Sequence, residues 1–300
     1  MRLVSKRSSR PPGPALAPLP AGLDLLRAGL IVLCMVATAM ALHLVFVSSL
    51  QHRSAQQRSY SAFRRTVAEG TAPLGPTDAS GRQLRRGTPV AFLEIPSIGV
   101  KEVVGVGTTA ADLMDGPGHR RDSPLPGQTG TSVVMGRQSA YGGPFNRLGD
   151  LKGGDKITMT TGQGVSRFTV ASLRRGGEPT PPPLRSGQGR LLLISAAGTS
   201  YVPSQLLRVD ANLDSPALRA PAPVITSKTL PPSERIMGTD PTTLWRLAFW
   251  LQALIAVALG IVWSWHRWGR AETWVVFLPV ATLAGLFASA EALKLLPNLL

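Results

Sequence analysis

Residues 90–100 read VAFLEIPSIGV, and residues 116–136 read GPGHRRDSPLPGQTGTSVVMG. In both stretches, short apolar runs are interrupted by glycine and proline, which end strands and favour turns. The pattern continues to residue 213 without a long amphipathic helix. A closed or nearly closed β-barrel is the class that suits such a series of short strands. The predicted strands span residues 90–95, 103–106, 132–135, 156–161, 167–173, 191–195 and 206–211, with one helical turn at 110–114.

Several motifs between residues 90 and 213 resemble those of the sortase family, and they occur in the same order. The resemblance implies a sortase-like closed β-barrel. Because the sequence is basic and rich in glycine and proline, it resembles the class E-like sortases of actinobacteria most. The matching stretches are FLEIPSIGV (92–100), GPGH (116–119), LPGQ (125–128), VVMG (133–136), YGGPF (141–145), LGDLKGGD (148–155), LLLIS (191–195) and ANL (211–213).

Sortases use three side chains to cut a sorting signal at the cell surface and pass its acyl group to an amine. A cysteine thiolate attacks the carbonyl, a histidine protonates the leaving amine, and an arginine holds substrate and oxyanion. The resemblance places Arg137 at the histidine position and Ala196 at the cysteine position. Leu206 falls at the arginine position. A shift of one residue would place Gln205 there, and Arg208 lies two residues further on.

The resemblance therefore implies a sortase-like protein without sortase chemistry. Alanine has no nucleophilic group, and losing such groups from a catalytic unit costs about four to six orders of magnitude in rate. The only cysteine, Cys34, lies in a predicted membrane span and cannot replace Ala196. We expect none of the three family positions to be catalytic.

Neighbouring polar residues are candidates for a binding groove or a substitute nucleophile. Ser195 precedes the cysteine position, so its side chain is expected on the opposite face of the strand. An alkoxide would need a base, and His119 is the only histidine in the predicted domain; its alternative role is a hydrogen bond within a loop. Arg137 is either an exposed arginine or a ligand for a carboxylate or phosphate. The groove candidates are His119, Arg137, Gln138, Ser195, Thr199 and Ser200.

The chain has 300 residues, with 32 Lys and Arg against 17 Asp and Glu, and a net charge of +15. Such an excess favours nucleic acid or an anionic membrane surface as a partner. The basic residues are spread along the chain, and only 6% of residues are aromatic, which disfavours nucleic-acid binding. A single cysteine excludes a disulfide framework. No metal-ligand, phosphate-loop or nucleotide motif is found, so no metal or cofactor is expected.

Three stretches are apolar enough to cross a bilayer, which takes about 20 residues. Residues 28–51 (AGLIVLCMVATAMALHLVFVSSLQ) carry no charged residue. A cleaved signal peptide is the alternative, because residues 37–39 (ATA) resemble a processing site. Residues 245–265 and 273–293, joined by the connector 266–272, predict a transmembrane hairpin with tryptophans near its ends.

The distribution of basic residues favours a cytoplasmic N-terminus and hairpin connector, with the β domain and the C-terminus outside the cell. Basic residues also follow the first span closely, so charge alone does not decide the orientation. The expected organisation is a basic cytoplasmic tail (1–27), a first span (28–51), a stalk (52–87), a sortase-like domain (88–213), a proline-rich tether (214–244), a second span (245–265), a cytoplasmic connector (266–272), a third span (273–293) and a tail (294–300).

Together these patterns predict a multi-pass cell-membrane protein with an all-β, sortase-like extracellular domain and three transmembrane helices. The leading hypothesis is a catalytically inactive subunit of the cell envelope that binds a peptide or acts as a scaffold. Its expected partners are the membrane, a membrane or envelope protein, and a sorting-signal-like peptide. The alternative is a divergent transpeptidase or hydrolase with a nucleophile other than cysteine. A third hypothesis is an assembly module whose groove is not used.

Overall fold

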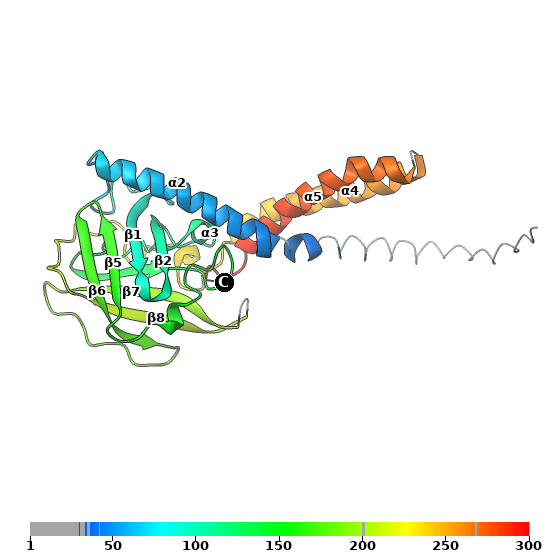
Figure 1. Ribbon diagram of the computed structural model, residues 1–300. Helices are drawn as coiled ribbons and strands as arrows, with labels where there is room; N and C mark the ends of the chain where they lie inside the picture. Colours follow the sequence, from blue (N-terminus) through cyan, green and yellow to red (C-terminus); the bar gives the residue numbers. More distant parts are fainter. Residues whose placement is uncertain are drawn as a thin grey trace, which may run out of the picture.

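A closed β-barrel of eight strands carries one long helix on its surface and a helical hairpin that projects from it (Figure 1). The computed structural model describes residues 30, 34, 37–41, 43–199, 202–267 and 269–299. The strand order around the barrel is β1-β2-β3-β4-β7-β8-β6-β5, which confirms the predicted closed barrel. The strands are β1 (Pro89–Ile95), β2 (Val100–Val106), β3 (Gly118–His119), β4 (Gly130–Met135), β5 (Lys156–Thr161), β6 (Gly164–Arg174), β7 (Gly189–Thr199) and β8 (Val202–Leu213).

Alternation of buried and less buried residues closes the sheet around an apolar interior. In β1, Leu93 and Ile95 are fully buried, as are Ile157 and Met159 in β5. Because side chains alternate between the two faces of a strand, these residues share the inner face. The same core cluster includes Phe168 and residues of β7 and β8. The barrel is therefore a packed core, and binding sites must lie on its outside or at its ends.

The β1–β2 connection and the shortest strand follow from local residue types. The 3-10 turn η2 (Pro96–Ile98) links β1 to β2, and Gly99 then takes φ 71, a conformation that glycine adopts without strain. A short helix, α3 (Asp112–Asp115), forms at the predicted helical turn. Strand β3 could not be predicted, because two residues are too few to show an alternating pattern.

The first half of the segment expected to be a stalk (52–87) is a helix that packs on the barrel. Helix α2 (Ser48–Ala68) follows the π-helical turn η1 (His43–Val47) and lies across β1 and β2 (Figure 1). Its buried face is narrow and includes Ala55 and Phe63, which are 3% and 4% exposed. The rest of the helix is rich in serine, glutamine and arginine. Such a narrow apolar stripe is hard to detect in sequence, so the helix was missed.

Polar side chains fix α2 on the barrel. The Gln56 side-chain nitrogen donates to the Val103 carbonyl oxygen at 3.2 Å and to that of Asp115 at 2.8 Å. Its side-chain oxygen accepts the Val103 N–H at 2.7 Å. His52 Nε2 lies 3.1 Å from Glu102 Oε1 on β2. The Gln56 side chain thus bonds both the N–H and the carbonyl oxygen of Val103, as a neighbouring strand would.

The segment expected to be a proline-rich tether also lies against the barrel. Leu218 forms a bridge with Gln128, and Glu234 is 1% exposed where it pairs with Arg121 on the β3–β4 loop. The segment contains two short 3-10 turns, η4 (Pro232–Glu234), which ends at Glu234, and η5 (Pro241–Thr243). Backbone pairing and a buried ion pair hold this segment on the barrel. Because neither interaction requires an apolar run, the sequence gives no sign of this contact.

Helices α4 (Leu244–Arg267) and α5 (Arg270–Lys294) form an antiparallel hairpin that projects from the barrel (Figure 1). The stretches Pro241–Trp265 and Glu272–Lys294 are long and apolar enough to cross a membrane. Much of their apolar surface is exposed in the structure. The two ends of the hairpin lie near the barrel and its connector lies at the far end, so a membrane-spanning hairpin would place the barrel and the segment after α5 on one side.

Two parts of the predicted architecture need correction. Within the described part of the chain, two helices are long and apolar enough to cross a membrane, instead of the three expected. The first predicted span, 28–51, is described only in part, with eight of its 24 residues outside the described ranges, and the whole tail 1–27 lies outside them. The label "all-β" fits the barrel alone, because α2, α4 and α5 are substantial parts of the structure.

The contact between α2 and β2 can be tested with two adjacent glutamines. Gln56→Ala removes three hydrogen bonds and leaves the Val103 N–H without a partner, at a cost of about 1–3 kcal/mol. Gln57→Ala is the matched control, because Gln57 is exposed. Amide hydrogen exchange of the full chain in detergent micelles should show faster exchange in α2 for Gln56→Ala only. Equal exchange in both variants would contradict this role of Gln56.

Candidate functional site

Strands β7 and β8 place two of the three family positions face to face. Ala196 on β7 pairs directly with Leu206 on β8, whereas Gln205 and Arg208 pair with other residues of β7. Directly opposed residues of an antiparallel pair share a face of the sheet. A methyl group and a leucine side chain therefore stand side by side at the two positions that the motif resemblance aligns with a thiol and a guanidinium group.

The third position, Arg137, follows the end of β4. This strand runs parallel to β7 with Met135 paired to Ile194, and the Gly136 N–H donates to the Ile194 carbonyl oxygen at 3.0 Å. The Ser195 hydroxyl donates to the Gly136 carbonyl oxygen at 3.0 Å and is fully buried. These bonds hold the chain just before Arg137 against β7 and confine the Ser195 side chain within the barrel wall.

Arg137 is buried, not exposed. Its side chain is 1% accessible, Nη2 donates to the Ala110 carbonyl oxygen at 2.8 Å, and the guanidinium carbon lies 5.2 Å from the centre of the Tyr141 ring. Burial lowers the pKa of Arg137 to about 10 and raises that of Tyr141 to about 12. Arg137 therefore keeps its charge at neutral pH and cannot exchange a proton there as a catalytic histidine does.

The outer face around Ala196 is covered by the C-terminal part of the chain. Leu299 is fully buried in one apolar cluster with Ala196 and neighbouring residues of β4 and β7. Leu206, Ile236 and Met237 pack against that cluster. The Gln138 N–H also donates to the Leu299 carbonyl oxygen at 3.2 Å. The covered face is thus apolar, with one backbone hydrogen bond at its edge.

Of the other groove candidates, Gln138 is the one that reaches the end of β7. Its side-chain nitrogen donates to the Gly198 carbonyl oxygen at 2.9 Å. Thr199 is exposed at the last position of β7, and Ser200 lies outside the described residues. The structure therefore brings together Arg137, Gln138, Ala196 and Leu206.

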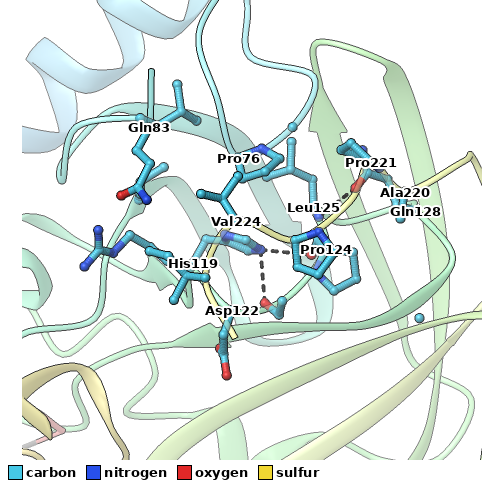
Figure 2. Close-up of a pocket in the computed structure, with 18 of the residues that line it drawn as sticks. Pro76, Gln83, His119, Asp122, Pro124, Leu125, Gln128, Ala220, Pro221 and Val224 are labelled. Carbon is cyan, nitrogen blue, oxygen red and sulfur yellow. Dashed lines mark hydrogen bonds between the residues drawn. The ribbon is translucent and has the colours of Figure 1, made fainter. Parts of the chain in front are cut away.

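His119 lies in a different environment, at a cavity of about 260 Å³ beside the β3–β4 loop (Figure 2). Its Nε2 is 2.9 Å from the Pro124 carbonyl oxygen and 3.2 Å from the Ser123 hydroxyl. Burial lowers the pKa of His119 to about 4, so the ring is neutral at pH 7. Because Ser195 donates to Gly136 instead, the described residues show no hydrogen bond between Ser195 and His119. The hydrogen bonds of His119 are those of a loop-structural residue.

Within the described residues, potential metal ligands cluster neither around Ala196 nor at the cavity beside His119. Among the residues that the structure describes, no three His, Cys, Asp or Glu side chains lie close enough together to hold a metal ion. Cys34 is exposed in the N-terminal region and lies outside the barrel. That the protein needs no metal or cofactor stays a prediction.

Comparison with known proteins relates part of the barrel to a family. Residues 93–180, less than half of the chain, match the family model of the sortase domain. Over 83 residues the chain is 31% identical to Sortase D of Bacillus subtilis (strain 168). That alignment covers 28% of this chain and 40% of the relative, so the chain spans less than half of the relative's length.

Solved structures of sortases are similar to this chain over about half of it. A Sortase D5 transpeptidase from Clostridium perfringens is 17% identical with a TM-score of 0.45, covering 54% of this chain and 99% of that one. Sortase A of Corynebacterium diphtheriae, a lid mutant, is 21% identical with a TM-score of 0.41, covering 54% and 95%. Clostridium perfringens sortase C with the C-terminal cell wall sorting motif is 17% identical with a TM-score of 0.41, covering 54% and 89%.

The matched part of the sortase domain includes Arg137 but ends before β7 and β8. The positions of Ala196 and Leu206 therefore depend on the motifs in the sequence and on the pairing of these two strands. Sequence analysis missed the contact of Arg137 with Tyr141 and the burial of Leu299. The YGGPF motif marks the loop that carries Tyr141, whereas no signal distinguishes Leu299 from other leucines that follow a membrane span.

The burial of His119 predicts a pH dependence of the stability of the sortase domain. The pKa falls from 6.5 to about 4 on folding, so between these values the unfolded chain binds a proton that the folded chain does not. The free energy of unfolding should fall by up to about 1.4 kcal/mol per pH unit as the pH drops through this window. His119→Asn should lack this component in denaturant unfolding at about pH 7, 6 and 5. Equal pH slopes for the two proteins would contradict the prediction.

Proposed function

We propose that this protein is a catalytically silent member of the sortase family that binds a peptide, or acts as a scaffold, in an assembly of the cell envelope. The single observation that carries the proposal is the pairing of Ala196 with Leu206 in an apolar cluster. At the two positions aligned with the family's cysteine and arginine, the groups that would perform acyl transfer are replaced by hydrocarbon side chains.

The chemistry of acyl transfer explains why this replacement matters. A covalent intermediate requires a nucleophile at the carbonyl, and a methyl group has none. The developing oxyanion requires a donor, and a leucine side chain has none. Arg137 is charged and enclosed by Ala110 and Tyr141, so it does not replace a titrating histidine. Each of the three roles is therefore unfilled at its family position.

The geometry gives less support to a divergent enzyme. A serine nucleophile needs a base within hydrogen-bonding reach. Ser195 is buried in the barrel wall and donates to Gly136, whereas His119 is bonded to Pro124 and Ser123. Activation of Ser195 by His119 would require both residues to exchange their partners.

A sorting-signal-like peptide is the proposed ligand class. The Clostridium perfringens sortase C structure is described with a C-terminal cell wall sorting motif, which makes that motif a suitable probe here. With Leu299 displaced, the face around Ala196 would offer apolar side chains together with backbone groups near Gln138. An extended peptide that combines an apolar side chain with backbone hydrogen bonds suits such a surface.

The proposed location is the outer surface of the cell membrane. Helices α4 and α5 provide the anchor, and Arg267 and Arg270 flank the connector between them. Basic residues are enriched in cytoplasmic loops, which favours a cytoplasmic connector and an external barrel. The exposed apolar surface of the hairpin would then face lipid or a membrane partner.

The proposal predicts no peptide cleavage by the native protein and partial restoration of activity by a triple variant. The full chain in detergent micelles is assayed for cleavage and amine transfer on a sorting-signal peptide, beside Arg137→His/Ala196→Cys/Leu206→Arg. The variant gains a thiol opposite an arginine. We expect detectable turnover for the variant and, for the native chain, at least about four orders of magnitude less than an intact sortase.

A matched control carries the same histidine and arginine but places the thiol at position 197. Ala197 is the next residue of β7, so its side chain points to the other face of the strand. Arg137→His/Ala197→Cys/Leu206→Arg should therefore be inactive. Turnover by the native chain, abolished by Thr199→Ala or His119→Ala, would overturn the proposal in favour of a divergent enzyme.

A further inference from the structure

Residues 297–299, read Pro-Asn-Leu, follow α5 and return to the barrel. We propose that this segment is an intramolecular ligand of the face around Ala196, and that the face recognises an asparagine followed by a leucine in a short peptide. A peptide partner then binds only by displacing the segment. This inference deepens the proposed function and depends on it for the identity of the displacing peptide.

Asn298 is held by backbone groups of two separate parts of the barrel surface. Its side-chain nitrogen donates to the Thr108 carbonyl oxygen at 2.6 Å and to the Arg235 carbonyl oxygen at 2.9 Å. Its backbone N–H donates to the Gly238 carbonyl oxygen at 3.1 Å. The residue is fully buried. Because two donated side-chain bonds define the orientation of the amide group, this position favours asparagine over an apolar residue.

Leu299 supplies the apolar part of the contact. Its side chain is fully buried in the cluster that contains Ala196, Met135 and Ile194, with Leu206 packed against it. Its carbonyl oxygen accepts the Gln138 N–H at 3.2 Å. A residue beside the family's histidine position and residues at the family's cysteine and arginine positions thus all take part in enclosing one leucine of the same chain.

The fit of the segment is incomplete, which permits its replacement. The side-chain oxygen of Asn298 is buried, and within the described residues it has no hydrogen-bond partner. A buried acceptor without a partner lowers the stability of the docked state. The segment is nevertheless favoured over free peptides because α5 ends at Lys294, close to the site, and such a short connection gives a high effective concentration.

The inference also explains why the face is apolar. A catalytic groove needs its thiol and guanidinium groups open to the substrate, and a leucine seated between them would compete with the substrate. With Ala196 and Leu206 in their places, the same positions instead bury the Leu299 side chain without leaving a polar group unpaired. The substitution of the catalytic residues and the docking of the segment are therefore compatible features of one surface.

The test uses a labelled peptide, Leu-Leu-Pro-Asn-Leu, which copies residues 295–299. Its binding to the full chain in detergent micelles is followed by fluorescence anisotropy. Asn298→Ala/Leu299→Ala should bind the peptide at least about tenfold more tightly than the native chain, because the intramolecular competitor is weakened. Leu296→Ala is the matched control: Leu296 is 38% exposed whereas Leu299 is fully buried, so this variant should bind like the native chain.

A milder variant distinguishes weakened docking of the segment from misfolding of the barrel. Asn298→Ala alone deletes the two side-chain bonds and leaves Leu299 in place, so peptide affinity should rise by a smaller factor. Amide hydrogen exchange of β1 and β5 reports that the barrel is intact, while exchange of the Gln138 amide should accelerate only in the two variants that weaken docking. Equal peptide affinity in all four proteins, or an unchanged Gln138 amide, would overturn the inference.

A sorting-signal peptide measured on the same samples separates the two proposals. Tighter binding of this peptide to Asn298→Ala/Leu299→Ala than to the native chain supports both. If only the Leu-Leu-Pro-Asn-Leu peptide gains affinity, the intramolecular ligand is supported and the sorting signal is excluded as the displacing partner. If the sorting signal binds native and variant chains equally and the Leu-Leu-Pro-Asn-Leu peptide also gains no affinity, the proposed function stands and the intramolecular ligand is overturned.

Discussion

The pairing of β7 with its two neighbours is the constraint on which the rest of the site depends. On one side β7 runs parallel to β4, and on the other it runs antiparallel to β8. These registers fix Arg137 beside the middle of β7 and set Leu206 opposite Ala196. A shift of one residue in either ladder would turn the Ala196 face toward the barrel interior. The position of every candidate residue therefore follows from hydrogen bonds between backbones.

Segments outside the strands complete the barrel by supplying polar bonds that the sheet leaves open. Gln56 of α2 pairs with the Val103 backbone, Asn298 with the Thr108 carbonyl, and Glu234 with Arg121. In each case a side chain distant in sequence satisfies a buried polar group, whose unpaired state would be costly. The barrel, the preceding helix and the segments flanking the hairpin are thus one packed unit rather than a domain on flexible tethers.

A part of the structure could be predicted when a short stretch of sequence carries its pattern. The strands and the barrel followed from alternating apolar runs broken by glycine and proline, and the β4 and β7 motifs gave the positions of Arg137 and Ala196. Helix α2 was missed because its stability comes from Gln56, His52 and a narrow apolar stripe, all of which depend on the barrel. The burial of Leu299 could not be predicted either, because Leu299 packs with residues such as Met135 that lie more than half the chain away in sequence.

The covering of the Ala196 face by Leu299 has a consequence for the order of synthesis. The strands of the barrel are complete at Leu213, whereas Leu299 is made only after both helices of the hairpin. Until then Met135, Ile194 and Ala196 form an uncovered apolar surface, of the kind that attracts chaperones or other nascent chains. Synthesis of α4 and α5 therefore precedes the closing of this surface, and a chain truncated before residue 297 would keep it open permanently.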